Sequence, residues 1–110
     1  MRALIVAAVL AALGAPAWSQ AVDYANRSGT ITTGGTAQAL MPAWTGRHGC
    51  LLQNLSTGDL WVSEVGTAAA TQPSIKVPAG SQYLCMAPAS SQALSVFGAT
   101  TGQAFAAREW

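Results

Sequence analysis

Residues 50–65 have the sequence CLLQNLSTGDLWVSEV, and this stretch decides the fold. It contains two runs of apolar and alternating residues, 50–55 and 60–65, each as long as an ordinary β-strand. The residues between them, 56–59, are serine, threonine, glycine and aspartate, which favour tight turns of the backbone. We therefore predict two strands joined by a short hairpin loop.

Short runs of the same kind recur along the chain after residue 22. They are apolar or alternating and are bounded by Gly, Pro, Ser and Thr: residues 29–33, 37–41, 74–77, 82–86, 93–97 and 103–108. Short strands separated by about ten residues are typical of antiparallel folds with two sheets. Because helical periodicity is absent from this part, we predict an all-β fold, a small two-sheet antiparallel β-sandwich of jelly-roll-like or immunoglobulin-like type, over residues 29–110.

Turn residues separate the predicted strands. Gly34-Gly35 predicts a tight hairpin between the first two strands, because glycine adopts positive φ without steric cost. Pro78-Ala79-Gly80 predicts a type II turn, with proline at the second position and positive φ at the glycine. In the strand before this turn, Ile75 and Val77 alternate with a lysine, so we expect both to face the core.

Alternation also assigns the two faces of the segment 60–65. Leu60 and Val62 share a face with Glu64, since side chains two positions apart lie on the same side of a strand. A carboxylate is costly to bury, so we predict that this face is the outer one. Trp61 and Val65 are then expected to point into the core.

The first residues predict export. A positive start at Arg2 is followed by the apolar run 3–13, then by glycine, proline and small residues, which is the pattern of a secretory signal peptide. We expect a signal helix over residues 1–19 with cleavage after Ser19, or alternatively after Ala17 or Ala21. A leader segment over 20–28 and a periplasmic or extracellular location are then expected. The run is shorter than the roughly 20 residues of a spanning helix, so no membrane span is expected in the mature chain.

Charge is sparse, at 8% of residues. After loss of residues 1–19, four cations face four acids: Arg27, Arg47, Lys76 and Arg108 against Asp23, Asp59, Glu64 and Glu109. Nucleic-acid binding needs a clustered basic face, which so few scattered cations do not make. Low charge leaves little repulsion between copies, so we expect a protein partner or self-assembly.

Candidate catalytic residues are few. The one histidine, His48, lies two positions from Cys50, and a Cys–His pair is conceivable if this stretch is extended. A solvent-facing loop histidine is the simpler interpretation. The residues have no spacing typical of a metal site or of a phosphate-binding loop. We therefore expect no enzyme, no metal and no cofactor.

The two cysteines, Cys50 and Cys85, both follow the predicted cleavage site. In an oxidising compartment they favour a disulfide, which would stabilise so small a domain. The alternative is that both are buried small hydrophobic residues that never meet. The sequence leaves these alternatives open.

Aromatic residues supply the candidate binding groups. Phe97 and Phe105 have strand spacing and are expected in the core. Trp44 lies in a predicted loop, where an exposed ring could stack on a sugar or anchor a protein contact, with Tyr83 and Trp110 as further candidates. A glycan is therefore a possible ligand. The alternative for Trp44 is a ring that folds back over the edge of the core.

Several segments together resemble a known group of proteins. They are Ser28-Gly29-Thr30-Ile31-Thr32, Gly49-Cys50-Leu51-Leu52-Gln53-Asn54-Leu55-Ser56, Ser74-Ile75-Lys76-Val77-Pro78-Ala79-Gly80 and Val96-Phe97-Gly98-Ala99-Thr100-Thr101-Gly102-Gln103. The chain resembles the small β-sandwich virion structural proteins, of head-decoration or fibre type, of tailed bacteriophages and prophages. The resemblance implies a non-enzymatic domain that assembles with copies or on a larger particle. The predicted signal peptide departs from it, since virions assemble in the cytoplasm.

Overall fold

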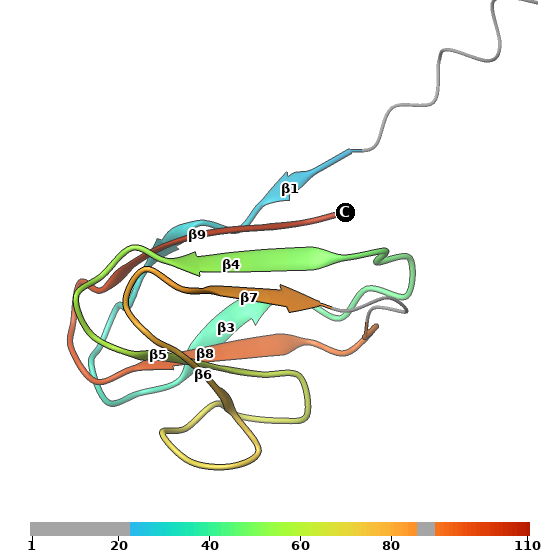
Figure 1. The fold of residues 1–110 in the computed structure, drawn as a ribbon. Helices are drawn as coiled ribbons and strands as arrows, with labels where there is room; N and C mark the ends of the chain where they lie inside the picture. The colour runs from blue at the N-terminus through green and yellow to red at the C-terminus, as the bar shows by residue number, and fades with distance from the viewer. Residues whose placement is uncertain (1–22, 86–89) are drawn as a thin grey trace, which may run out of the picture.

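The computed structural model describes residues 23–85 and 90–110, which form two antiparallel β-sheets (Figure 1). The predicted signal peptide, residues 1–19, lies outside the described residues. No helix occurs within the described ranges, in agreement with the all-β prediction. A search of those ranges finds no helix with the length and hydropathy needed to cross a membrane.

The first sheet, sheet A, has the strand order β1-β9-β4-β7, and β2 also pairs with β9. Its strands are β1 (Ala25–Asn26), β2 (Gly29–Thr30), β4 (Cys50–Asn54), β7 (Gln82–Cys85) and β9 (Ala104–Glu109). β1 and β2 pair with successive parts of β9, so they act as one interrupted edge strand. β1 lies within the segment 20–28 that was interpreted as a leader, and sequence patterns did not predict it as a strand.

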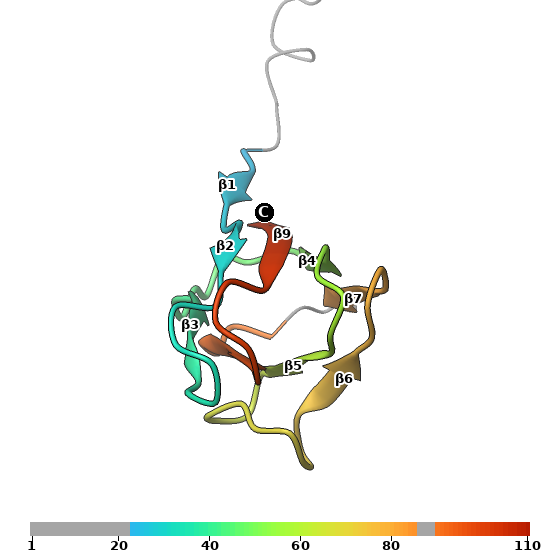
Figure 2. The same cartoon turned by 90° about the vertical axis from the view of Figure 1, so that its left-hand side faces the viewer.

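The second sheet, sheet B, has the order β3-β8-β5-β6. Its strands are β3 (Gln38–Met41), β5 (Leu60–Ser63), β6 (Ile75–Val77) and β8 (Leu94–Gly98). Seen along the strands, β6 and β7 lie on one flank of the molecule, and β2 and β3 lie on the opposite flank (Figure 2). Each flank therefore carries one edge of each sheet.

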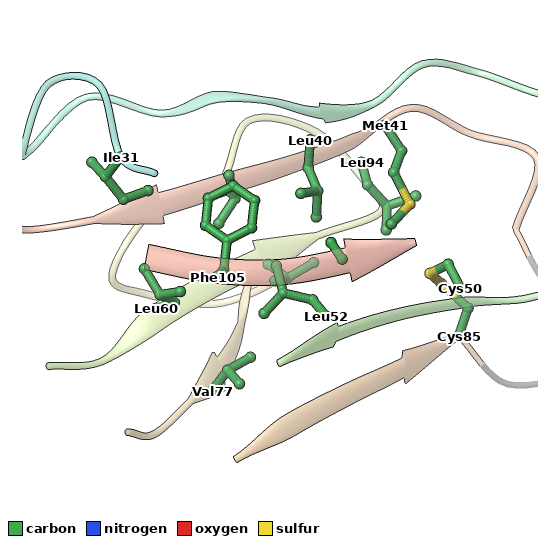
Figure 3. Packing of buried hydrophobic residues seen from close by; sticks show 13 residues of the cluster. Ile31, Leu40, Met41, Cys50, Leu52, Leu60, Val77, Cys85, Leu94 and Phe105 are labelled. Atoms are coloured by element: carbon green, nitrogen blue, oxygen red, sulfur yellow. A yellow bond between two sulfur atoms is a disulfide. The ribbon is translucent and has the colours of Figure 1, made fainter. Parts of the chain in front are cut away.

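The hydrophobic core lies between the sheets (Figure 3). Its members are buried side chains from both sheets: Ile31, Leu40, Met41, Cys50, Leu52, Leu60, Val62, Val77, Cys85, Leu94, Val96, Phe105 and Ala107. β4 and β8 alternate strictly between buried and half-buried residues, as strands with one face on a core do. Phe105 projects from β9 into the centre of this layer, as predicted (Figure 3).

The predicted faces of segment 60–65 are wrong. Leu60 and Val62 are fully buried, whereas Val65 is 72% exposed and Trp61 is half-buried outside the core. The reason is that β5 ends at Ser63. Glu64 lies beyond the strand, so its position does not indicate which face of β5 is the outer one. Phe97 pairs directly opposite Trp61 and shares its outward, half-buried position, so the core prediction for Phe97 is also wrong.

The two predicted hairpins are wrong as well. Residues 56–59 connect β4 of sheet A to β5 of sheet B, and Gly34-Gly35 lies between β2 of sheet A and β3 of sheet B. Both loops cross between layers because the successive strands pair with partners far away in sequence. The glycine of Pro78-Ala79-Gly80 does have positive φ, at 77°. The Ser81 amide donates to the Pro78 carbonyl at 2.9 Å, so proline occupies the first position of this turn.

Candidate functional site

A buried charge cluster lies at the end of β9. Glu109 is completely buried, and its Oε2 accepts from Nε of Arg27 at 2.6 Å and its Oε1 from Nε of Arg47 at 3.0 Å. The Arg47 side chain is also fully buried, whereas that of Arg27 is 35% exposed. Two guanidinium groups surround one carboxylate, so the excess positive charge of this cluster is closest to solvent at Arg27.

Arg47 organises the loops next to this cluster. Its Nη1 donates to the carbonyls of Ser90 and Gln92 at 2.6 and 2.8 Å, and its Nη2 donates to the carbonyl of Pro42 at 2.7 Å. A single side chain thus joins the loop after β3 to the segment before β8. This arrangement fixes the loop that carries Trp44.

Trp44 is 39% exposed and lines a hollow of about 320 Å³. Arg27, Pro42 and Glu109 line the same hollow, so the indole lies beside the buried charge cluster. A β-carbon on Gly46 would lie 2.9 Å from Nε1 of Trp44, which shows that the ring also packs over its own loop. Trp44 is therefore partly exposed and also packs against its own loop.

Trp110 follows Glu109 and closes the same end of sheet A. Its amide donates to the Gly49 carbonyl at 3.1 Å, and its carbonyl accepts from the Gly49 amide at 3.0 Å. A β-carbon on Gly49 would lie 2.6 Å from Cζ2 of Trp110, so the close approach of the indole requires glycine here. Trp110 also contacts Tyr24, with the ring centroids 5.3 Å apart.

Tyr83 lies elsewhere. It pairs opposite Leu52 and packs against the core, and its hydroxyl donates to the carboxylate of Glu64. Burial raises the pKa of Tyr83, and the hydrogen bond to Glu64 and the charge of that carboxylate raise it further. Tyr83 thus connects β7 of sheet A to the end of β5 in sheet B, whereas Trp44 and Trp110 lie at the end of β9.

The two cysteines form a disulfide between β4 and β7. Cys50 and Cys85 are directly opposite in register, with their Cα atoms 4.9 Å apart (Figure 3). The bond resolves the alternatives that the sequence left open. It also leaves Cys50 without a free thiol, so a Cys50–His48 nucleophile is not available in this structure.

Two buried amide side chains hold the loops that cross between the sheets. Nδ2 of Asn54 donates to the carbonyls of Gly58 and Val77 at 2.7 and 2.8 Å. Nε2 of Gln103 donates to Oγ of Ser56 and to the carbonyl of Asp59, both at 3.1 Å. Among the described residues, every buried side-chain nitrogen and oxygen has a hydrogen-bond partner. These buried polar groups are therefore committed to holding the fold.

Tyr24 is the exposed aromatic residue that sequence reasoning missed, at 58% exposure. It lies within the predicted leader segment, residues 20–28, so it was assigned no role. The signal that could have found it is an aromatic residue two positions before the consecutive polar residues Asn26, Arg27 and Ser28.

Within the described ranges, no group of three or more His, Cys, Asp and Glu residues is arranged to hold a metal ion. Comparisons with protein-family models, with curated proteins and with solved structures found no match to this chain.

Proposed function

We propose that this protein is an exported, non-enzymatic structural or interaction module, which works by assembling with copies of itself or by docking on a partner through its surface. The observation that carries the proposal is the pair of apolar side chains on the β6–β7 flank, defined by strands β6 and β7. Ile75 on β6 is 53% exposed and Leu84 on β7 is 55% exposed.

The β6–β7 flank has the features of an assembly surface. β6 and β7 end their respective sheets in the described part of the chain, so each pairs with one neighbour and presents a free backbone edge on its other side. Ile75 pairs opposite the fully buried Val62, but it lies at the open edge and is exposed, so the prediction that it joins Val77 in the core is wrong. Exposed apolar groups beside free edges favour contact with a second chain.

The strand orders support a jelly-roll interpretation of the two sheets. If β1 and β2 count as one interrupted strand, β1-β9-β4-β7 and β3-β8-β5-β6 are the orders of an eight-stranded jelly roll with two Greek keys. Jelly rolls build viral capsid proteins and lectins. This topology therefore fits both the virion-like role that the sequence resemblance implies and the alternative of glycan binding.

Light scattering coupled to size exclusion tests the assembly proposal. The wild-type protein should increase in mass with concentration, and Ile75→Lys with Leu84→Lys should remove the increase, because two ammonium groups cannot be buried unpaired in an interface. Thr30→Lys, at an exposed position of β2 on the opposite flank, is the control and should associate like the wild type. A wild-type protein that stays monomeric at high concentration and retains no partner in pull-down experiments would refute the proposal.

A second function is favoured by the hollow beside Trp44, namely binding of a glycan or an envelope component. The 39% exposed indole of Trp44, beside the guanidinium of Arg27, provides a stacking surface and hydrogen-bond donors for a sugar. A glycan array compares the wild type with Trp44→Ala. Signals that disappear in the variant support this function, and an array without signal excludes it.

Export is the remaining part of the proposal. The disulfide between Cys50 and Cys85 supports it, because such bonds persist in oxidising compartments. Expression of the full coding sequence, followed by fractionation and N-terminal sequencing, tests it. The protein should be recovered outside the cytoplasm with Gln20 as its first residue, and a cytoplasmic protein that retains Met1 would contradict export.

A further inference from the structure

The outer face of sheet A contains a hollow of about 510 Å³ that lies apart from the Trp44 hollow. A volume of this size falls in the range of small-ligand sites, about 300–1,000 Å³. Its lining comes from β1, β4, β7 and β9, so it spans the width of the sheet. Arg108 is the charged member of the nine residues that line it.

Strand register places the lining side chains in two rows. Asn26, Arg108 and Leu51 are paired across β1, β9 and β4 in the first row. Ala106, Gln53 and Gln82 are paired across β9, β4 and β7 in the second. The rows therefore combine amide groups and one guanidinium with the apolar side chains of Leu51 and Ala106.

Neighbouring groups hold the polar side chains of the first row in place. The guanidinium carbon of Arg108 lies 5.1 Å from the centroid of the Tyr24 ring, a cation–π arrangement. The Tyr24 ring is itself packed against Trp110. Oδ1 of Asn26 accepts from the Ser28 amide at 3.0 Å, which fixes the orientation of the Asn26 amide. A ligand would thus meet groups that are already ordered.

The geometry points to a binding site for an acidic carbohydrate, a glycan that carries carboxylate groups. Arg108 pairs with a carboxylate through two parallel N–H donors. The amides of Asn26, Gln53 and Gln82 donate to and accept from sugar hydroxyls. The part of the Tyr24 ring that Arg108 and Trp110 leave exposed contacts the apolar C–H groups of a sugar ring. The positive charge of Arg108 distinguishes this site from one for neutral glycans.

This inference goes beyond the proposed assembly and uses neither Ile75 nor Trp44. Isothermal titration calorimetry tests it. The purified protein, expressed from the full coding sequence, is titrated with a trimer of galacturonic acid. The fully methyl-esterified trimer is the matched ligand control, because it keeps the sugar rings and removes the negative charges. We expect binding of the acidic trimer, at least tenfold weaker binding of the ester, and a further loss of affinity as salt concentration rises.

Variants locate the site. Arg108→Gln should weaken binding of the acidic trimer at least tenfold and remove the preference over the ester. Tyr24→Ala should weaken binding of both ligands, whereas Trp44→Ala should change neither. Arg108 and Tyr24 are exposed, and an unchanged thermal midpoint in each variant establishes that folding is intact.

Several results would overturn the inference. The first is that the galacturonic acid trimer does not bind the wild type. The second is that the wild type binds the trimer and its methyl ester with equal affinity. The third is that Arg108→Gln binds the acidic trimer as tightly as the wild type does. Tighter binding of a trimer of glutamate than of galacturonic acid would assign the surface to acidic peptides instead. None of these results affects the light-scattering test of assembly, so the two proposals can fail separately.

Discussion

Glu109 is the residue on which the packing at the end of β9 depends. Its carboxylate balances the buried guanidinium of Arg47, which in turn holds three loop carbonyls. Removing one partner of a buried ion pair leaves the other charge without compensation in a medium of low dielectric constant. A single substitution here should therefore affect both the strand and the loops around it.

We predict that Glu109→Gln lowers the free energy of unfolding by about 3–5 kcal/mol, the usual effect of breaking a buried pair from one side. Urea denaturation measures the change. The matched control is Asp59→Asn, which breaks an exposed pair, Lys76 Nζ to Asp59 Oδ2 at 3.4 Å, with side chains 51% and 45% exposed. It should cost less than about 1 kcal/mol. Equal losses of unfolding free energy in the two variants would show that burial of an ion pair does not determine how much the pair stabilises the fold.

Tyr83 predicts how stability depends on alkaline pH. Its pKa in the folded protein is raised above the ordinary value of 10.0 by burial and by Glu64. Unfolded chains therefore lose this proton first as pH rises. The stability that Tyr83 contributes is fully present below about pH 10 and is lost as pH rises toward the folded pKa.

Denaturation at a series of pH values above about 9 measures this dependence. The free energy of unfolding should fall with pH in the wild type, and the fall should be less steep in Tyr83→Phe, which has no proton to lose. Glu64→Gln should also reduce the slope, because it removes the carboxylate that disfavours the ionised phenol. Identical slopes in all three proteins would contradict this role of Tyr83.

At the scale of elements, the disulfide fastens the edge strand β7 to the central strand β4. The bond joins residues 35 positions apart, and closing a loop of that length restricts the unfolded chain. We predict that the double substitution Cys50→Ala with Cys85→Ala lowers the free energy of unfolding by about 3–4 kcal/mol on the chain-entropy estimate. Reduction of the wild type should give a similar loss in urea denaturation. A loss below about 1 kcal/mol in both would mean that the strand pairing alone holds β7.

Sequence patterns located the strands better than their partners. Most of the predicted runs match a strand within one or two residues, because alternation and turn residues are local signals. For example, the predicted strand over residues 50–55 corresponds to β4, Cys50–Asn54. Pairing was not predictable in this way, since β4 lies between β9 and β7, both distant in sequence. The hairpin predictions failed because the same kind of polar, glycine-containing sequence forms loops between neighbouring strands of one sheet and loops that connect two sheets.

The candidate site was predicted only in part, for a similar reason. Loop position gave Trp44 a role that its exposure allows. Tyr83, in contrast, turned inward because its partner in register, Leu52, faces the core. The hollow on sheet A depends on Arg108 and Tyr24, which are far apart in sequence and meet only through pairing of β1 with β9. Such a site appears only when the strand order is known.

For the whole molecule, the two flanks differ in character. The exposed positions of β6 and β7 are Ile75, Lys76, Gln82 and Leu84, which include two large apolar side chains. The exposed positions of β2 and β3 on the other flank are Gly29, Thr30 and Ala39, which include none. The net charge of the whole chain is only +1, so electrostatic repulsion between copies is weak. Association through one flank would produce a defined pair or array of molecules rather than general aggregation.

Hydrogen exchange at low and high protein concentration tests association through this flank most directly, because it reports which edge becomes covered. The backbone amides of β6 and β7 should exchange more slowly at high concentration, whereas those of β2 and β3 should exchange at the same rate at both concentrations. Ile75→Lys with Leu84→Lys should remove the difference. Exchange that is independent of concentration at every strand, or protection confined to the β2–β3 flank, would contradict the proposed mode of action.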